Sequence, residues 1–330
     1  MAMTALTGKD DVAGKDHMAG SDHLAIEALL RDDLRHADQA VVHMAPILRH
    51  LLRNDDSAVF SDEVIARVRG MLADLERQLI RALGDAAGFA RPSALQGGGD
   101  AGLADALSAQ GRLLNHLHML ALEWQLTERL QARLGIDPVL TPLLQDFVAS
   151  PDPDTAARGM NLLAAQARFG QAIRRMQMPL AELPDDLHEL AIAVMLASVA
   201  DDVVGTAAAD EAALFLRRTR TAHTARIDLL RDALDACTEI PLPDKAGVAL
   251  FLTAMATRSA IARDMAIMAT TESQMARLQL LLASAGLERD GIVAVFAAFH
   301  PEMVLPVDVE TLDPSRAAAM LAESHSGNGA

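Results

Sequence analysis

Apolar side chains in this chain recur at alternating steps of four and three residues. One such series opens near residue 24 and is made of Leu30, Leu34, Ala37, Val41, Met44, Leu48 and Leu51. A second series runs from Leu103 to Trp124 with the same steps. This spacing places the apolar side chains on one face of an α-helix, so both segments are predicted to be helices that pack as in a coiled coil.

The composition limits what such helices can bury. The chain has 330 residues, of which 51% are hydrophobic, but only 3% are aromatic and none is Tyr. A core of this kind must be built from Ala, Leu, Val, Ile and the 16 Met residues. The hydrophobic content excludes a chain that is disordered over most of its length.

Helix boundaries in the rest of the chain are predicted from Pro, Gly and acidic residues. No segment is predicted to be a strand. The further helices are expected at 61–83, 138–149, 154–178, 185–200, 208–237, 244–269, 272–284 and 289–299. The sequence therefore predicts an all-α fold without a sheet, either a layered multi-helix globule or a degenerate α-solenoid of antiparallel helix pairs.

Glycine-rich and polar stretches divide the chain. Three similar polar hexapeptides begin at Gly8, Gly14 and Gly20, and Pro46 is expected to kink or split the helix that follows them. The predicted division is a disordered repeat tail at 1–21, a helical hairpin at 22–90, a glycine-rich linker at 91–100, a main helical domain at 101–301 and a mobile tail at 302–330.

Charge and cysteine content indicate compartment and partners. The net charge of −16 repels a phosphate backbone, which argues against nucleic acid as a partner. Cys237 is the single cysteine and cannot form an internal disulfide, which fits a reducing cytoplasm. The longest uncharged apolar run, 190–200, is about half of what a membrane-spanning helix needs. A cytoplasmic protein without membrane insertion is expected.

Familiar catalytic and metal-binding spacings fail. His36, His43 and His50 are seven residues apart, so they cannot share one metal ion from one helix. Gly97–Gly102 matches a dinucleotide-binding pattern but lacks the strand that this motif needs. No catalytic residue, metal ligand or cofactor is predicted. This favours a non-enzyme without excluding an enzyme, because catalytic groups can be far apart in sequence.

Two groups of arginines stand out in the acidic chain. One predicted helix carries Arg168, Arg174 and Arg175, and a later one carries Arg217, Arg218, Arg220, Arg226 and Arg231. The candidates for binding a partner or an anion are Arg174, Arg175, Arg217, Arg218 and Arg220. The alternative is an ordinary solvated face on which these arginines pair with Glu and Asp.

Residues 245–303 contain Gly-Val-Ala-Leu-Phe-Leu-Thr-Ala-Met-Ala, then an Ala285-Gly286-Leu287 turn, then Val-Phe-Ala-Ala-Phe-His-Pro. This stretch resembles the C-terminal half of an uncharacterised all-helical bacterial family. The resemblance implies a helical, HEAT-like protein and adds no activity or site residue.

The helical surfaces are the most distinctive feature of the sequence. They predict a non-enzymatic interaction or regulatory protein, a scaffold or adaptor, whose partner is another protein or a second copy of the chain. The alternative is a helical pocket protein that binds or converts a small apolar or anionic ligand, for which a cavity of several hundred Å³ would be expected.

Overall fold

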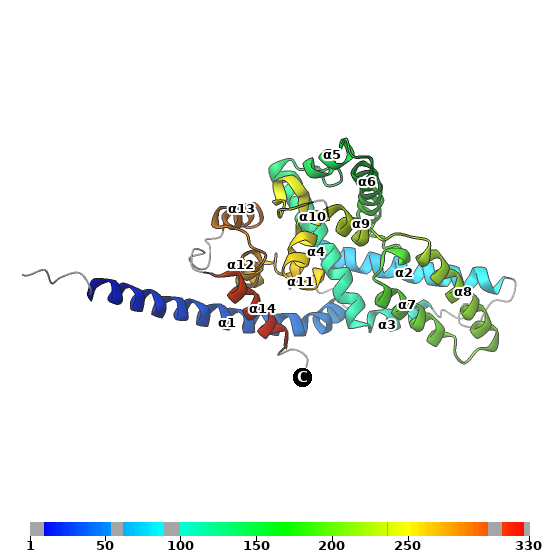
Figure 1. Cartoon of the computed structure of the whole chain (residues 1–330). Helices are drawn as coiled ribbons and strands as arrows, with labels where there is room; N and C mark the ends of the chain where they lie inside the picture. The colour runs from blue at the N-terminus through cyan, green and yellow to red at the C-terminus, as the bar shows by residue number, and fades with distance from the viewer. Residues whose placement is uncertain (1–9, 54–61, 89–99, 236, 303–311, 327–330) are drawn as a thin grey trace, which may run out of the picture. The chain divides into compact units, whose positions relative to one another are not determined.

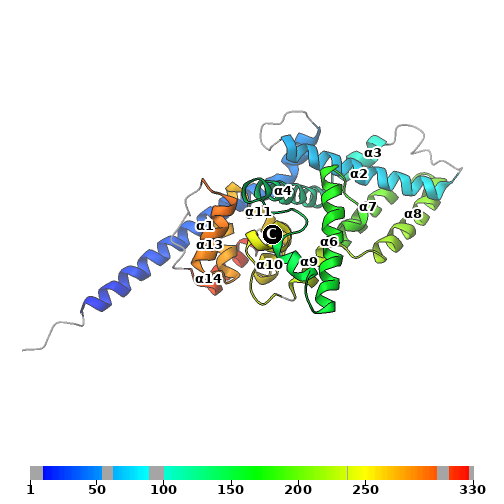
Figure 2. The same cartoon turned by 90° about the horizontal axis from the view of Figure 1, so that it is seen from above.

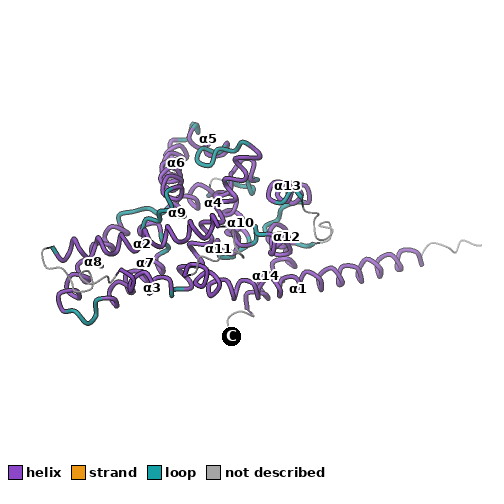
Figure 3. Tube along the Cα trace, turned by 180° about the vertical axis from the view of Figure 1, so that it is seen from behind, coloured by secondary structure: helices purple, strands orange, loops and turns teal. Residues whose placement is uncertain are grey.

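The computed structural model describes residues 10–53, 62–88, 100–235, 237–302 and 312–326. All regular secondary structure in these residues is helical, and they contain no strand (Figure 3). The predicted all-α fold is therefore confirmed. The expected linker at 91–100 lies outside the described residues except at Asp100, where a helix begins.

The chain divides into two compact units, which we call the terminal unit (residues 1–42 and 269–330) and the central unit (residues 43–268). Helix α1 (Asp10–Arg53) contributes to both. The terminal unit also contains η3 (Glu272–Gln274), α12 (Met275–Ser284), α13 (Arg289–Phe299) and α14 (Pro314–Ser326). The central unit contains α2 (Asp62–Ala87), α3 (Asp100–Ser108), α4 (Gly111–Leu134), α5 (Pro142–Val148), α6 (Pro153–Arg174), η2 (Leu180–Glu182), α7 (Asp185–Ser198), α8 (Val203–Thr221), α9 (Arg226–Leu234), α10 (Pro243–Arg258) and α11 (Arg263–Met268).

Helix α2 supplies a long apolar stripe to the core of the central unit (Figures 1 and 2). It packs against α8, α4 and α3, and its buried stripe follows the expected helical spacing at Val68, Met71, Leu75 and Leu79. The side of α8 that meets this core carries mostly alanine, which lets the two helices approach closely. The apolar core is thus built mostly from Leu, Ala, Val and Met, with Trp124 and Phe169 as its aromatic members.

Helix α4 is covered on more than one side. The face expected from the sequence, which includes Leu114, Leu117 and Trp124, is buried in the core. Helices α10 and α11 pack on α4 as well. This second cover buries Glu123, a position that the single-face pattern leaves open to solvent.

The terminal unit is held by a buried arginine. Arg277 of α12 is 0% exposed and donates hydrogen bonds to Asp38 of α1 and to Gln274. Gln274 Nε2 in turn donates to the carbonyl oxygen of Ala37 at 2.9 Å. The apolar face of α1 is buried in the same region, at Leu30, Leu34 and Ala37.

The described residues differ from several expectations about the chain's ends. Helix α1 begins at Asp10, inside the segment expected to be disordered, and it continues through Pro46 without being split. The expected hairpin at 22–90 is divided between the two units, because α1 contributes to both. Helix α14 contains a short helix that the sequence indicates at 315–323, inside a tail that was otherwise expected to be mobile.

Three side chains explain why this last helix is fixed. Ala317, Met320 and Leu321 are spaced to share one face, they are buried, and α14 packs on α12. The tail therefore contributes apolar surface to the terminal unit.

Two predicted long helices are broken. The segment expected as one helix at 208–237 forms α8 and α9, separated by residues 222–225. The segment expected at 244–269 forms α10 and α11, separated by residues 259–262, where Ala260 has a positive φ of 52°. Each break places an arginine, Arg226 or Arg263, at the start of a new helix.

Candidate functional site

Two of the five candidate arginines are already engaged within the central unit. Arg217 of α8 binds Glu189 of α7 through two nitrogens, with Nη2 2.7 Å from Oε2 and Nε 3.0 Å from Oε1. Arg220 Nη2 lies 2.8 Å from Asp185 Oδ1 at the start of α7. These contacts match the alternative that the arginines form a solvated face paired with acids.

The other three candidates have different surroundings. The guanidinium carbon of Arg174 lies 5.2 Å from the ring centroid of Trp124, within the range of a cation–π contact. Arg175 is the exposed C-cap of α6, and Arg218 is exposed on α8. Neither Arg175 nor Arg218 forms an ion pair with any residue that the structure describes. The candidates are thus distributed over two helices, α6 and α8, and three kinds of environment.

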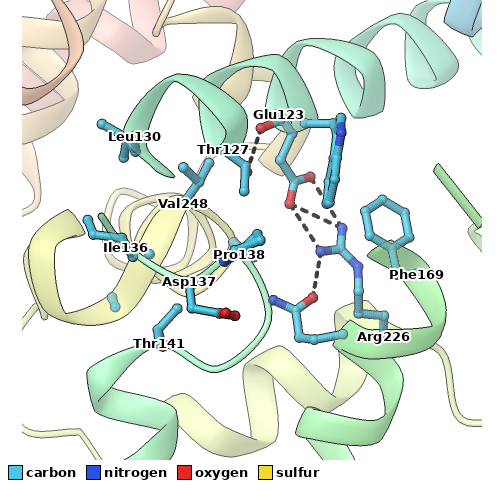
Figure 4. Close-up of a pocket in the computed structure, with 15 residues that line it drawn as sticks. Glu123, Thr127, Leu130, Ile136, Asp137, Pro138, Thr141, Phe169, Arg226 and Val248 are labelled. Carbon is cyan, nitrogen blue, oxygen red and sulfur yellow. Dashed lines mark hydrogen bonds and ion pairs between the residues drawn. The ribbon is translucent and has the colours of Figure 1, made fainter. Parts of the chain in front are cut away.

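A cluster of charged side chains that the sequence did not single out lies inside the central unit. Glu123 of α4, which is 2% exposed, lies between Arg226 of α9 and Arg263 of α11. Figure 4 shows its contact with Arg226. Arg226 Nη1 is 3.1 Å from Glu123 Oε1, and Arg263 Nη1 is 2.8 Å from Glu123 Oε2. Because both arginines begin helices, the two chain breaks bring them to one carboxylate.

Further contacts fix both guanidinium groups. Arg226 Nη1 donates to Gln166 Oε1 at 3.0 Å, and the guanidinium carbon lies 3.7 Å from the ring centroid of Phe169. Arg263 Nε donates to Thr253 Oγ1 at 3.0 Å. Buried charges need this degree of pairing to offset the loss of hydration. The cluster therefore joins α4, α6, α10 and α11 to the first residue of α9.

Glu182 of η2 positions Arg226 from the backbone side. Its Oε2 accepts the backbone N–H of Arg226 at 2.8 Å, and its Oε1 lies 2.8 Å from His223 Nε2. Helix α9 has no side-chain cap at Ala225, so this distant carboxylate satisfies one of the free N–H groups at the start of the helix.

The electrostatics of the cluster argue against acid–base chemistry. Burial opposes ionisation of Glu123, but the charges and hydrogen bonds of Arg226 and Arg263 outweigh it and hold the pKa of Glu123 well below its ordinary value. The carboxylate therefore stays ionised at neutral pH. A general acid or base works best with a pKa near the working pH, which this group does not have.

The space beside the cluster is small. A cavity of about 20 Å³, the volume of about one water molecule, is lined by Glu123, Thr141, Phe169 and Arg226 among others (Figure 4). Gly247 closes one wall with a positive φ of 68°, and a Cβ there would lie 2.5 Å from Thr141 Cγ2. The interior is therefore packed around the charges rather than hollowed for a ligand.

A second hollow of about 250 Å³ opens between α9, α10 and α11. Its lining includes Arg231, Thr253, Thr257 and Arg263. The hydroxyls of Thr253 and Thr257 donate to the carbonyl oxygens of Ala249 and Thr253, and Arg263 binds Glu123. Most polar groups that could face a ligand here are already bound within the chain.

The outer side of α8 is different. Four of the eleven large hydrophobic side chains that are exposed in the described residues lie on this helix, namely Val203, Val204, Leu214 and Phe215. Their exposed fractions reach 62% for Phe215 and 87% for Val203. We use the name α8 face for the exposed residues Val203, Ala207, Asp210, Glu211, Leu214, Phe215 and Arg218.

Two other kinds of site are absent from the described residues. Within the described residues, no group of three or more His, Cys, Asp or Glu side chains is arranged to hold a metal ion. The helices described by the structure include none with the length and apolar character to cross a membrane.

Comparison with known protein families found no match. Searches of curated proteins and of solved structures also found no matching protein. The resemblance of residues 245–303 to an uncharacterised helical family stays a prediction.

The sequence does contain one signal for the buried cluster. Glu123 is the only acidic residue between Asp105 and Glu128, in a stretch dominated by apolar side chains. A single acidic residue in such a stretch indicates a buried carboxylate. Its charge is then either unpaired or paired with basic side chains from other helices. The identity of those groups, Arg226 and Arg263, depends on helix breaks that local sequence does not mark.

Proposed function

We propose that this chain is a non-enzymatic helical interaction protein that binds another protein chain through the α8 face. The observation that carries the proposal is the exposure of Leu214 and Phe215, at 54% and 62%, in the middle of α8. Single exposed apolar residues are common, whereas a group of them on one helix marks an interaction surface.

The charged residues around this apolar centre support the proposal. Asp210, Glu211 and Arg218 are exposed and form no ion pair with any described residue. Interfaces of moderate size typically surround an apolar centre with polar groups that select the partner. The charged cluster inside the central unit, by contrast, has its polar groups satisfied by the chain itself.

The proposal is tested by changing the apolar centre. Leu214→Glu places a charge in the middle of the α8 face, and Met160→Glu makes the same change at an exposed residue of α6 as a matched control. Affinity purification with cross-linking, using lysate supplemented with a differently tagged copy of the chain, measures what each variant captures. We expect a stoichiometric protein partner to be lost with Leu214→Glu and kept with Met160→Glu.

Two results contradict the proposal. One is the reproducible lack of any stoichiometric protein partner, including a second copy. The other is equal capture by the wild type and the Leu214→Glu variant.

The alternative of a small-ligand pocket has less support. The cavity of about 20 Å³ beside Glu123 is far below the several hundred Å³ expected of a ligand site, and the open hollow near Arg263 has most of its polar groups bound within the chain. Thermal unfolding with inorganic phosphate or a small dicarboxylate measures this alternative, and a saturable rise in Tm that is lost in Arg231→Ala would favour it.

A further inference from the structure

We propose that the partner of the α8 face is a second copy of this chain, with the two α8 helices antiparallel and related by a two-fold axis. This inference rests on the proposed function, because it names the occupant of the same surface. It is carried by the order of the charged residues along the helix.

Each acidic residue of α8 comes seven residues before a basic residue, a spacing that prevents these acid–base pairs from forming within one helix. Glu211 and Arg218 are seven residues apart, so they share one flank of the helix but are separated by about 10 Å of rise. Pairs within a helix form at three or four residues. Asp210 and Arg217 repeat the same arrangement on the opposite flank.

Two-fold symmetry joins what the single helix keeps apart. A two-fold axis across an antiparallel helix pair keeps each flank on its own side and reverses the direction of the chain. An axis between Leu214 and Phe215 therefore places Glu211 opposite Arg218 of the second copy, and Arg218 opposite Glu211 of the second copy. The apolar Leu214 side chains of the two copies then meet at the centre.

The residues about two helical turns from the axis fit the same arrangement. Ala207 and Thr221 lie on opposite sides of this axis, each about two turns of helix from it, so Ala207 of one copy lies near Thr221 of the other. Both side chains are small, which allows the helices to approach. A parallel arrangement would instead place Glu211 against Glu211 and Arg218 against Arg218.

The self-pairing is complete with respect to charge. Glu211 and Arg218, which form no ion pair with described residues, both gain an opposite charge. Asp210 gains Arg217 of the second copy, which keeps its contact with Glu189 at the edge of the surface. An unrelated helix would have no reason to match an acid and a base that lie at equal distances on either side of an axis between Leu214 and Phe215.

Charge reversal with complementation tests the inference. Sedimentation equilibrium over a wide range of concentration is expected to show a monomer–dimer equilibrium for the wild type. Glu211→Arg and Arg218→Glu each replace two attractive contacts with two repulsive ones, so each variant alone should dimerise more weakly by about tenfold or more. An equimolar mixture of the two variants should recover the dimer, because every facing pair is then opposite in charge.

The double variant Glu211→Arg/Arg218→Glu should also recover the dimer, since the symmetry is kept with the signs exchanged. Asp232→Arg makes the same charge change at an exposed residue of α9 and should leave dimerisation unchanged. Circular dichroism confirms that each variant retains its helical content.

The outcomes separate this inference from the proposed function. A wild-type chain that is monomeric at every concentration overturns the inference, as do single variants that dimerise like the wild type or a mixture that fails to recover the dimer. If the chain is monomeric but Leu214→Glu abolishes capture of a different protein, the proposed function stands and only the second-copy partner is wrong. If Leu214→Glu changes neither self-association nor capture, both are wrong.

Discussion

Arg226 and Arg263 share the carboxylate of Glu123 inside the central unit, whereas Arg218 lies on the outer side of α8 without an ion pair among the described residues. All three belong to the same residue type and the same unit. The guanidinium groups of the buried pair donate hydrogen bonds to side chains from several helices of the same chain. The guanidinium group of the exposed Arg218 can still bind an acidic group of a partner chain.

This difference shows how the same charge can serve stability in one place and recognition in another. Inside the unit, each guanidinium has lost its hydration and must be compensated, so removing a partner leaves an uncompensated charge. On α8, water and salt screen the charges, and losing one costs the fold little. Four predictions test or refine this contrast, in order of decreasing effect.

The largest effect is expected from Glu123→Gln. The amide keeps the shape of the side chain but leaves two buried arginines without a counter-charge, so the free energy of unfolding should fall by about 3–5 kcal/mol. Urea denaturation measures this change. The matched control Glu189→Gln breaks the exposed pair with Arg217 and should cost about 0–1 kcal/mol. Similar losses for the two variants would remove the contrast.

A buried histidine should make the central unit sensitive to acid. Burial lowers the pKa of His118 to about 4 from 6.5, so the folded protein binds this proton less readily than the unfolded chain. The stabilisation is complete above pH 6.5 and is lost as the pH falls through about 4, with a total on the order of 3 kcal/mol.

Unfolding measured from pH 7 to pH 4 should therefore show a shallower loss of stability for His118→Gln than for the wild type. An unchanged slope for His118→Gln would show that burial does not control this proton.

Close packing around the charged cluster is tested by Gly247→Ala. The positive φ of Gly247, with ψ at −179°, belongs to a region that only glycine adopts easily, and the new Cβ would meet Thr141. A loss of about 1–3 kcal/mol in thermal or urea unfolding is expected. Gly84→Ala, on α2 where nothing lies within 4 Å of the new Cβ, should instead stabilise the helix by about 0.5–1 kcal/mol. A neutral Gly247→Ala would show that the cavity wall can relax.

The smallest effect on stability is expected on α8. Arg218→Ala should change the free energy of unfolding by less than about 0.5 kcal/mol, because the side chain is exposed and forms no ion pair with a described residue. The same urea experiment checks this value beside that for Glu123→Gln. A loss of several kcal/mol would mean that this arginine supports the fold and is not held for a partner.

The spacing of apolar residues predicted the helical fold class and the buried face of α4. Leu114, Leu117 and Trp124 follow this spacing and are buried in the structure. The spacing did not predict the break before Arg226, because the N–H group at the start of α9 is satisfied by Glu182, which is 44 residues away in the chain. Neither this break nor the one before α11 contains a proline or a glycine. In the second break the positive φ falls on Ala260, an alanine, which is not a residue type that favours this conformation.

The charged cluster was missed for the same reason. With 208–237 and 244–269 taken as continuous helices, Arg226 joins the exposed arginines and Arg263 has no defined neighbour. The α8 face was missed differently: Arg218 was a candidate, but the exposure of Leu214 depends on which side of α8 meets α2, and a helix rich in alanine gives little apolar contrast between its sides.

The terminal unit is assembled from both ends of the chain, and Arg277 and Asp38, which join inside it, are 239 residues apart in sequence. During synthesis on the ribosome, domains fold as their sequence becomes complete, so all of the central unit emerges before α12 exists. Until then, the apolar face of α1 at Leu30, Leu34 and Ala37 has no cover from its own unit. A nascent chain stalled before residue 269 therefore presents a helix face of the kind that chaperones bind, while the central unit can already be folded.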